Sequence, residues 1–289
     1  MKESGKRMER TKLVIVDGHN LLFQMFYGMP NRILNKDGKA IQGTLGFVGA
    51  LIKIIKQTEP THLLVLFDSE HENPRTEVLE EYKANRPDFS KVPDEENPFC
   101  QLPDVYKALD YMGIRHQEVE EMETDDVIAS YVYAYEKSTD IVVVSWDSDF
   151  FQLIGPNVKV LRYRGKNSVW CDEGFLKDKF DIVPKQYAGF KALVGDKADN
   201  IKGVNKIGIK TAAALLQQFG SLEQILKNVE QIAKKAVRES LMTSIEQVHT
   251  NYRLIKLDGS AKRPFEWEKL TYKYDGKTTN QILEGIGVK

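Results

Sequence analysis

The chain has 289 residues, and its 42 acidic and 41 basic side chains nearly cancel. This length allows one elaborate domain or two modest ones, and the charge balance excludes a uniformly basic surface. Cys100 and Cys171 lack the spacing of a zinc or disulfide framework, which favours a reducing compartment. No apolar run approaches the roughly 18 residues of a membrane span, and the polar N-terminus lacks the apolar core of a secretory signal. We therefore expect a cytoplasmic protein with no membrane contact.

The first part of the chain alternates apolar strands with helices. Residues 11–17 form a β-branched run that ends at Asp17, and residues 61–68 form a second run that ends at Asp68. Between these two runs, apolar residues occur at helical spacing over residues 21–29 and 43–56. This alternation predicts a parallel sheet, whose functional side chains stand at the carboxyl ends of the strands. One aspartate there is often only a helix cap, whereas two indicate a site.

Residues 72–98 differ in character, because they are highly charged and contain four prolines. Tyr82, Lys83 and Arg86 can share one helical face, and Arg75 precedes them. One interpretation is a solvated loop. The other is a cover over the strand ends that handles phosphates, and the residues leave both open.

Acids recur in the middle of the chain. A helix predicted over residues 102–112 and a strand over 114–119 lead to a helix from Thr124 to about Lys137, whose start carries Glu123, Asp125 and Asp126. The helix dipole favours each such acid by a few tenths to about 1 kcal/mol. This effect explains the presence of one or two acids at a helix start, but it explains less well three acids that share a small volume.

Residues 140–144 predict another buried strand, and Asp147 and Asp149 follow its end. Such a pair suits a divalent metal, although a capped loop explains the pair alone equally well. Residues 158–166 predict a more exposed strand with alternating basic residues.

The stretch from Leu193 to Leu216 combines two features. Asp196 and Asp199 lie three residues apart, and a glycine-bounded turn then opens into an alanine-rich helix. Free N–H groups at such a helix start can bind a phosphate without reading bases. The alternative is a plain helical hairpin with solvated aspartates. Beyond it we expect helices over residues 221–236 and 237–257, an extended element over 266–274 and a terminal helix from 278.

Five segments thus offer nine carboxylates at one edge of the predicted sheet: Asp17, Asp68, Glu123, Asp125, Asp126, Asp147, Asp149, Asp196 and Asp199. They would repel one another unless protonated or bound to cations. Oxygen ligands without histidine or cysteine favour magnesium or manganese over zinc. Two such ions about 4 Å apart can clamp the attacking and leaving oxygens of a phosphodiester. The pattern predicts a nuclease.

These motifs, in this order, resemble those of the 5′-nuclease (flap endonuclease) superfamily, specifically the bacterial 5′–3′ exonuclease that occurs at the N-terminus of DNA polymerase I and as a stand-alone form. The resemblance implies an α/β, PIN-like core over residues 11–180, with a parallel central sheet flanked by helices and a helical arch at about 70–98. It also implies a helical DNA-binding region over 181–289, with a helix–three-turn–helix motif at about 192–219.

The resemblance also implies roles for single residues. Asp17, Asp68, Asp125 and Asp126 would hold one metal ion, Asp147, Asp149, Asp196 and Asp199 a second, and Glu123 would act through bound water. Lys83 and Arg86 would be catalytic beside Asp17, Asp68, Asp125 and Asp147, and Tyr82 could stack on a base. A potassium ion would bind the carbonyls of Leu193, Val194, Lys202, Val204 and Ile207. DNA contacts would come from Arg75, Tyr82, Lys83, Arg86, Gly203, Lys206, Gly208, Lys210 and Thr211. Gln24 stands where polymerase-attached relatives usually carry arginine.

The implied activity is a magnesium- or manganese-dependent 5′–3′ exonuclease and flap endonuclease. It would act as a monomer on DNA with a 5′ flap, nick or 5′ end, with RNA–DNA hybrids as further candidates. The setting would be primer removal and repair at the nucleoid in the bacterial cytoplasm. The alternative is a protein that binds DNA junctions with little catalysis.

Overall fold

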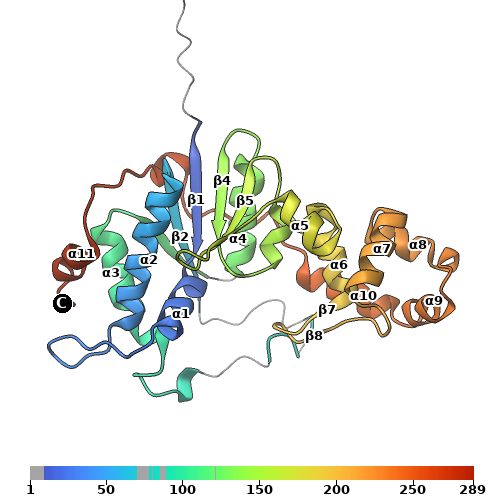
Figure 1. Cartoon of the computed structure of the whole chain (residues 1–289), viewed down its shortest axis with the longest axis horizontal. Helices are drawn as coiled ribbons and strands as arrows, with labels where there is room; N and C mark the ends of the chain where they lie inside the picture. Colours follow the sequence, from blue (N-terminus) through green and yellow to red (C-terminus); the bar gives the residue numbers. More distant parts are fainter. Residues whose placement is uncertain (1–9, 70–77, 80, 85–88, 121) are drawn as a thin grey trace, which may run out of the picture.

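A single twisted sheet lies at the centre of the structure, a computed structural model that describes residues 10–289 except 70–77, 80, 85–88 and 121 (Figure 1). Its strand order is β3-β2-β1-β4-β5-β6. The strands are β1 (Lys12–Asp17), β2 (His62–Asp68), β3 (Arg115–Val119), β4 (Asp140–Val144), β5 (Val158–Arg162) and β6 (Val169–Cys171). The first five are parallel and β6 is antiparallel to β5, which confirms the predicted α/β fold. β5 is more buried than we expected, because β6 pairs with its outer edge.

Helices cover both faces of the sheet. Successive strand residues point to opposite faces, so Val14 and Val16 pack in one cluster while Leu13 and Ile15 pack in another. The first cluster includes side chains of α1 (Gly18–Gly28), α2 (Gln42–Thr58) and α3 (Leu102–Tyr111). The second includes those of α4 (Thr124–Tyr135) and continues into the helical region. Both faces are therefore dry, as the continuous apolar strands require.

A helical region follows the sheet and lies to its right in Figure 1. It contains α5 (Glu173–Phe180), α6 (Tyr187–Val194), α7 (Ile209–Phe219), α8 (Leu222–Lys227), α9 (Lys235–Met242) and α10 (Ile245–Ile255). The short hairpin of β7 (Gly195–Asp196) and β8 (Ile201–Lys202) connects α6 to α7.

The sequence predicted two helices over residues 221–257, and the structure has three. A 3₁₀ turn at Val229–Gln231 separates α8 from α9. Thr243 is the C-cap of α9, and its hydroxyl donates to the carbonyls of Glu239 and Ser240, local bonds of the kind that compete with helix continuation.

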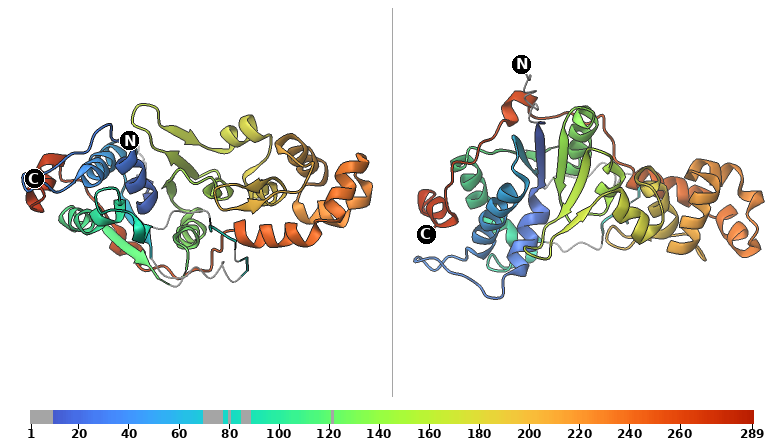
Figure 2. Two further views of the ribbon diagram at one scale, coloured as in Figure 1. Left: turned by 90° about the horizontal axis from the view of Figure 1, so that it is seen from below. Right: turned by 45° about the horizontal axis from the view of Figure 1, so that its top comes forward.

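The C-terminal segment returns from the helical region to the opposite side of the sheet, where α11 (Thr279–Gly285) packs on α2 and α3 (Figure 2). The extended element predicted at 266–274 is wrong in part, because a 3₁₀ turn spans Trp267–Leu270. Thr271 makes only an isolated bridge to His62. Stacking of Trp267 on the His62 ring, at 3.9 Å between centroids, holds this turn against the sheet.

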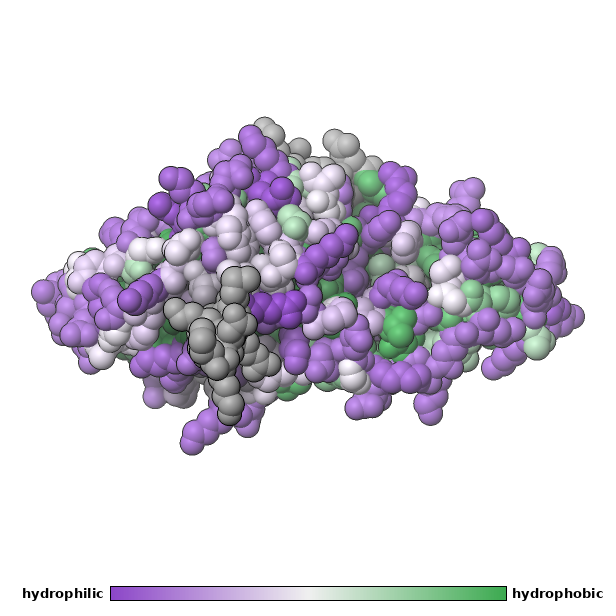
Figure 3. Space-filling view, turned by 90° about the horizontal axis from the view of Figure 1, so that it is seen from above, coloured by the Kyte–Doolittle hydropathy of each residue, from purple (hydrophilic) through white to green (hydrophobic). Residues whose placement is uncertain are grey.

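In Figure 3 hydrophilic side chains cover most of the face at the amino ends of the strands. No helix within the described ranges is both long enough and apolar enough to span a membrane. The described residues of the predicted arch form turns and a 3₁₀ helix, Phe89–Lys91. The remainder of that predicted arch, with Arg75 and Arg86, lies outside the described residues.

Candidate metal centre

The carboxyl ends of β1, β2 and β4 meet at one edge of the sheet, below it in Figure 1. Asp17 and Asp68 are the last residues of their strands, and Asp147 follows β4 closely. Asp125 lies in the first turn of α4 and interacts electrostatically with Asp147 and Asp68. The structure therefore brings together acids from four separate segments, as the sequence predicted.

Local contacts fix the position of Asp17. Its Oδ1 accepts the backbone N–H of Asn20 at 3.0 Å and so caps α1. Its Oδ2 accepts the hydroxyl of Ser145 at 2.8 Å. Ser145 and Asn20 were not singled out from the sequence. Ser145 belongs to the site because β1 and β4 are neighbours in the sheet, whereas Asn20 is a local partner three residues after Asp17.

The acids at this edge resist ionising together. Burial, then the charges of Asp68 and Asp147, raise the pKa of Asp17 from its usual 3.8 to about 7. Burial, then Asp147 and Glu123, raise the pKa of Asp125 well above its usual range. Burial acts in the same direction on Asp68, but hydrogen bonds with His19 and Thr124 outweigh it and hold that pKa below its usual range. A bound cation would favour the ionised form of every member.

A second group of acids lies beside the first. Single oxygen atoms of Asp149, Asp196 and Asp199 lie within 4.8 Å of one another. Asp149 comes from the segment after β4, Asp196 ends β7, and Asp199 lies in the hairpin turn. Burial raises the pKa of Asp149 to about 7, and the Asp147 charge adds to this while Lys191 opposes it. The group unites two motifs that are 47 residues or more apart in the sequence.

These donors fit magnesium or manganese. The ligand atoms are carboxylate oxygens, which hard divalent ions prefer. Among the described residues, the potential metal-binding group contains neither histidine nor cysteine, unlike the usual zinc site. The raised pKa values of Asp17 and Asp149 mark two places where a cation would relieve repulsion.

Lys191 is a member of the site that the sequence analysis missed. It lies on α6 with 7% of its surface exposed. Its Nζ is 2.8 Å from Asp149 Oδ1 and also forms an ion pair with Asp196. A lysine on a predicted helix gives no sequence signal of this kind, because its partners come from other segments.

Glu123 contacts the base of the predicted arch. Its Oε1 accepts the Lys83 ammonium at 2.6 Å and the Tyr82 hydroxyl at 3.2 Å. The Lys83 backbone N–H also donates to the carbonyl of Asp199 at 3.1 Å. Lys83 therefore lies at the acidic edge. Tyr82 is only 3% exposed, so the expectation that its ring stacks on a base is not supported by this conformation.

Asp126 also differs from the expectation. Its Oδ1 accepts the backbone N–H of Asp258 at 2.7 Å, on the side of α4 that faces the C-terminal segment. Neighbouring residues of a helix point about 100° apart, so Asp125 and Asp126 do not share a direction. The described contacts therefore place Asp125, but not Asp126, among the carboxylates at the sheet edge.

Glycines allow two backbone segments to approach each other closely in the hairpin between α6 and α7. A Cβ on Gly203 would stand 2.1 Å from the carbonyl oxygen of Val194. Gly208 is the N-cap of α7 and provides no side-chain cap for the N–H groups that follow. Lys206 and Lys210 are exposed on either side of it, and Thr211 is half-buried.

Some carbonyls of the predicted potassium site already accept hydrogen bonds. The carbonyl of Lys202 accepts from the Asn251 and Gln247 amides at 2.8 and 2.7 Å. The carbonyls of Leu193 and Val204 accept the N–H groups of Val204 and Ile207 at 2.8 and 3.1 Å. The carbonyls of Leu193 and Val204 each have a second lone pair, which these hydrogen bonds leave available.

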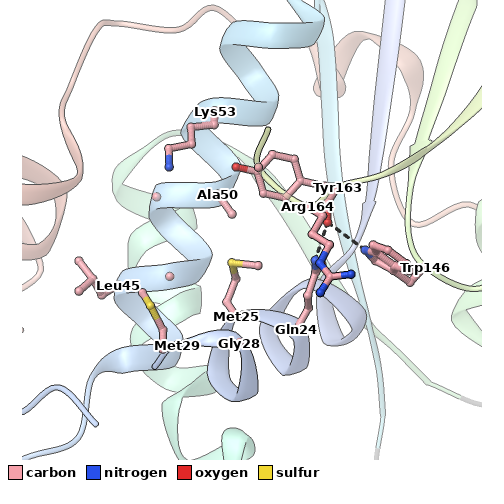
Figure 4. A pocket seen from close by; sticks show the side chains of 13 residues that line it. Gln24, Met25, Gly28, Met29, Leu45, Ala50, Lys53, Trp146, Tyr163 and Arg164 are labelled. Atoms are coloured by element: carbon pink, nitrogen blue, oxygen red, sulfur yellow. Dashed lines mark hydrogen bonds between the residues drawn. The ribbon is translucent and has the colours of Figure 1, made fainter. Parts of the chain in front are cut away.

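A separate cavity of about 590 Å³ lies between α1, α2 and the ends of β4 and β5 (Figure 4). Gln24 lies on its wall, where its side-chain amide donates to the carbonyl of Tyr163 at 2.5 Å. The indole N–H of Trp146 donates to the same oxygen at 2.9 Å. Gln24, which stands where polymerase-attached relatives usually carry arginine, thus ties α1 to the end of β5.

Two family models match the chain in succession: the N-terminal resolvase-like domain of 5′–3′ exonuclease over residues 12–181, and its C-terminal SAM fold over 182–278. A 5′–3′ exonuclease of Buchnera aphidicola subsp. Acyrthosiphon pisum is 32% identical over 96% of this chain and 97% of that protein. DNA polymerase I of Streptococcus pneumoniae is 34% identical over 98% of this chain, which spans 32% of the polymerase.

Solved structures share the fold. The T5 5′-exonuclease with bound zinc has a TM-score of 0.71 at 24% identity, covering 95% of this chain and 99% of that one. The catalytic core of Rad2 in complex with a DNA substrate has a TM-score of 0.57 at 16% identity, covering 96% of this chain and 93% of that one. The sheet with its helical extension is therefore an architecture shared with nucleases.

Proposed function

The chain belongs to the 5′–3′ exonuclease family, and from this premise we propose that it hydrolyses phosphodiester bonds in DNA that carries a 5′ flap, a nick or a 5′ end. The observation that carries the proposal is the buried acidic edge, where Asp17, Asp125 and Asp149 lie among other carboxylates. RNA–DNA hybrids are further candidate substrates. We place the activity in primer removal and repair, by a monomer at the nucleoid of a bacterial cytoplasm.

The acids divide into two groups of proposed ligands. Asp17, Asp68, Asp125 and Asp147 would hold one ion at the strand ends, and Asp149, Asp196 and Asp199 would hold another. Magnesium ions bound there would supply Lewis-acid stabilisation of the attacking and leaving oxygens. Glu123 would contribute through water, because its Oε1 already accepts from Lys83 and Tyr82.

Lys83 is the proposed catalytic cation. Its side chain is 17% exposed and its ammonium lies against Glu123 at the edge of the acidic group. A phosphate that enters between the acids and the arch would bring its oxygens within reach of this ammonium, which would offset negative charge in the transition state. Arg86 would assist from the part of the arch that follows.

The hairpin between α6 and α7 is the proposed duplex contact. The uncapped start of α7 offers backbone N–H groups, and exposed Lys206 and Lys210 add positive charge. A helix N-terminus with adjacent lysines suits the phosphate backbone and does not depend on base identity. A potassium ion bound by the hairpin carbonyls would strengthen this contact.

A labelled 5′-flap substrate tests the proposal directly. We expect magnesium-dependent cleavage near the junction, with a 5′-phosphate on the retained strand and a 3′-hydroxyl on the released piece. Asp149→Asn should abolish cleavage while junction affinity in calcium stays within about threefold, since the substitution leaves the duplex contact intact. Asp178→Asn, at an exposed position of α5, is the matched control and should cleave normally.

Tight junction binding with no cleavage in magnesium or manganese would reject the proposed nuclease activity. That result would favour the alternative, a non-catalytic protein that binds DNA junctions.

A further inference from the structure

Lys191 places a positive charge inside the group of acids that is proposed to hold the second ion. Its Nζ contacts Asp149 Oδ1 at 2.8 Å, pairs with Asp196 Oδ2, and lies 3.3 Å from Ser148 Oγ. The side chains of Lys191, Asp149 and Asp196 are 9%, 8% and 13% exposed. The ammonium therefore contacts two of the three carboxylates that lie within 4.8 Å of one another.

The surroundings explain how a buried lysine is tolerated here. Removing an ammonium from water costs several kcal/mol unless good ion pairs and hydrogen bonds replace the lost hydration. Two carboxylates and a serine hydroxyl provide that replacement, and the three acids in turn need a cation to remain ionised together. The lysine and the acids thus stabilise one another without any bound metal.

A divalent ion must enter this group against the ammonium. Such an ion needs carboxylate oxygens at close range, and Lys191 already contacts an oxygen of Asp149 and one of Asp196. Two cations that share the same carboxylates repel each other, and in a partly buried group this repulsion is only weakly screened.

We propose that Lys191 is a resident counter-cation of the Asp149–Asp196–Asp199 group, which holds these carboxylates together in the metal-free protein and gives up contacts when a divalent ion binds. Lys191 then sets the affinity of the second ion, so that this site fills at a higher metal concentration than its acids alone would require. It is a positioning residue in this scheme. The inference rests on the proposed metal role of the group, but the tests below use neither DNA nor activity.

Manganese binding provides the first test. It is measured through the paramagnetic resonance signal of free Mn²⁺, which disappears as the ion binds. Lys191→Met removes the charge and keeps an apolar side chain of similar length, whereas Lys185→Met removes an exposed lysine from the preceding 3₁₀ helix as a control. We expect Lys191→Met to tighten the weaker of two Mn²⁺ sites by about tenfold or more, because a competing charge has gone. The control should match the wild type.

Thermal stability provides the second test on the same variants. Without divalent ions, Lys191→Met should melt on the order of 10 °C below the wild type, because the buried acids lose their partner. Saturating Mg²⁺ should recover most of this loss, since the ion replaces the missing charge. An equal deficit with and without Mg²⁺ would overturn the proposal and make the lysine a fixed structural partner.

A third measurement follows the metal response of the wild-type protein and does not depend on the stability of Lys191→Met. The ¹⁵Nζ resonance of Lys191 is assigned as the signal that Lys191→Arg lacks. We expect this resonance to shift or broaden when Mg²⁺ is added. An unchanged resonance at saturating Mg²⁺ would overturn the proposal that Lys191 gives up contacts when a divalent ion binds. Unaltered Mn²⁺ affinity in Lys191→Met would reject only this inference, whereas no Mn²⁺ binding to the wild type would reject the proposed metal centre as well.

Discussion

Replacing Asp17 by asparagine should separate stability from function at the acidic edge. Folding raises the pKa of Asp17 from 3.8 to about 7, chiefly through burial and the Asp68 charge. The native protein therefore binds this proton more tightly than the unfolded chain does. The free energy of unfolding must fall as the pH rises from about 4 to about 7. Above that range the wild type retains a penalty of roughly 4 kcal/mol in the absence of metal.

Asparagine at this position keeps the local geometry and removes the charge. Its side-chain oxygen can still accept the Asn20 N–H and cap α1, because asparagine caps helices as well as aspartate does. Its amide can donate to Ser145 Oγ, which lies 2.8 Å from Asp17 Oδ2. The main consequence of the substitution is therefore electrostatic.

Thermal denaturation in EDTA measures the effect. At a pH of about 8, Asp17→Asn should be more stable than the wild type by up to about 4 kcal/mol, or on the order of 10 °C in Tm. The gain should shrink towards zero as the pH falls through about 4, because the carboxyl then becomes protonated in the unfolded state as well as in the native state. Saturating Mg²⁺ should also reduce it, since the ion stabilises only the wild-type carboxylate.

Asp178→Asn controls for the loss of an exposed charge on α5. A variant at position 17 that is less stable than the wild type in EDTA at high pH, or whose gain does not depend on pH, would refute the reasoning. Either result would mean that Asp17 is stabilised by contacts of its ionised form and not destabilised by its neighbours.

Lys83→Ala should lower the flap-cleavage rate by roughly 100-fold or more while changing junction affinity in calcium less than about threefold; equal losses in both would make it a phosphate anchor. Gly203→Ala should destabilise the protein by about 1–3 kcal/mol, because the new Cβ would meet the Val194 carbonyl at 2.1 Å. Gly208→Ala, whose Cβ meets no atom within 4 Å, should cost less than about 1 kcal/mol in the same melting experiment, because only the preference against alanine at a helix N-cap opposes it. Tyr82→Phe should lower stability by about 1 kcal/mol through the lost bond to Glu123 with little change in DNA affinity, and a large loss of affinity would restore its role in base stacking.

Sequence alone predicted the sheet and most of the acidic edge. Asp17 and Asp68 end apolar strands, and Asp147 follows another. Parallel strands end at the same edge of a sheet, so the chain order of strands and helices was enough to bring these acids together. The order of the five motifs also indicated the family that the two family models identify.

The helical region was predicted less well. Helical periodicity extends across Val229–Gln231 and Thr243, where the structure interrupts it. Side chains beside both breaks donate to the backbone of the preceding turn, Asn228 to the carbonyl of Gln224 and Thr243 to that of Glu239, and a pattern of apolar residues does not report such bonds.

The direction of each side chain was decided only by the tertiary structure. Asp125 and Asp126 look equivalent in the sequence, yet one lies among the carboxylates and the other binds the Asp258 backbone. Lys191 looks like any helical lysine until α6 places it between Asp149 and Asp196. Sequence thus determined which residues reach the strand ends, because strand order and spacing carry that information. The packing of distant segments determined which charges meet there, because burial and pairing depend on neighbours that no local pattern contains.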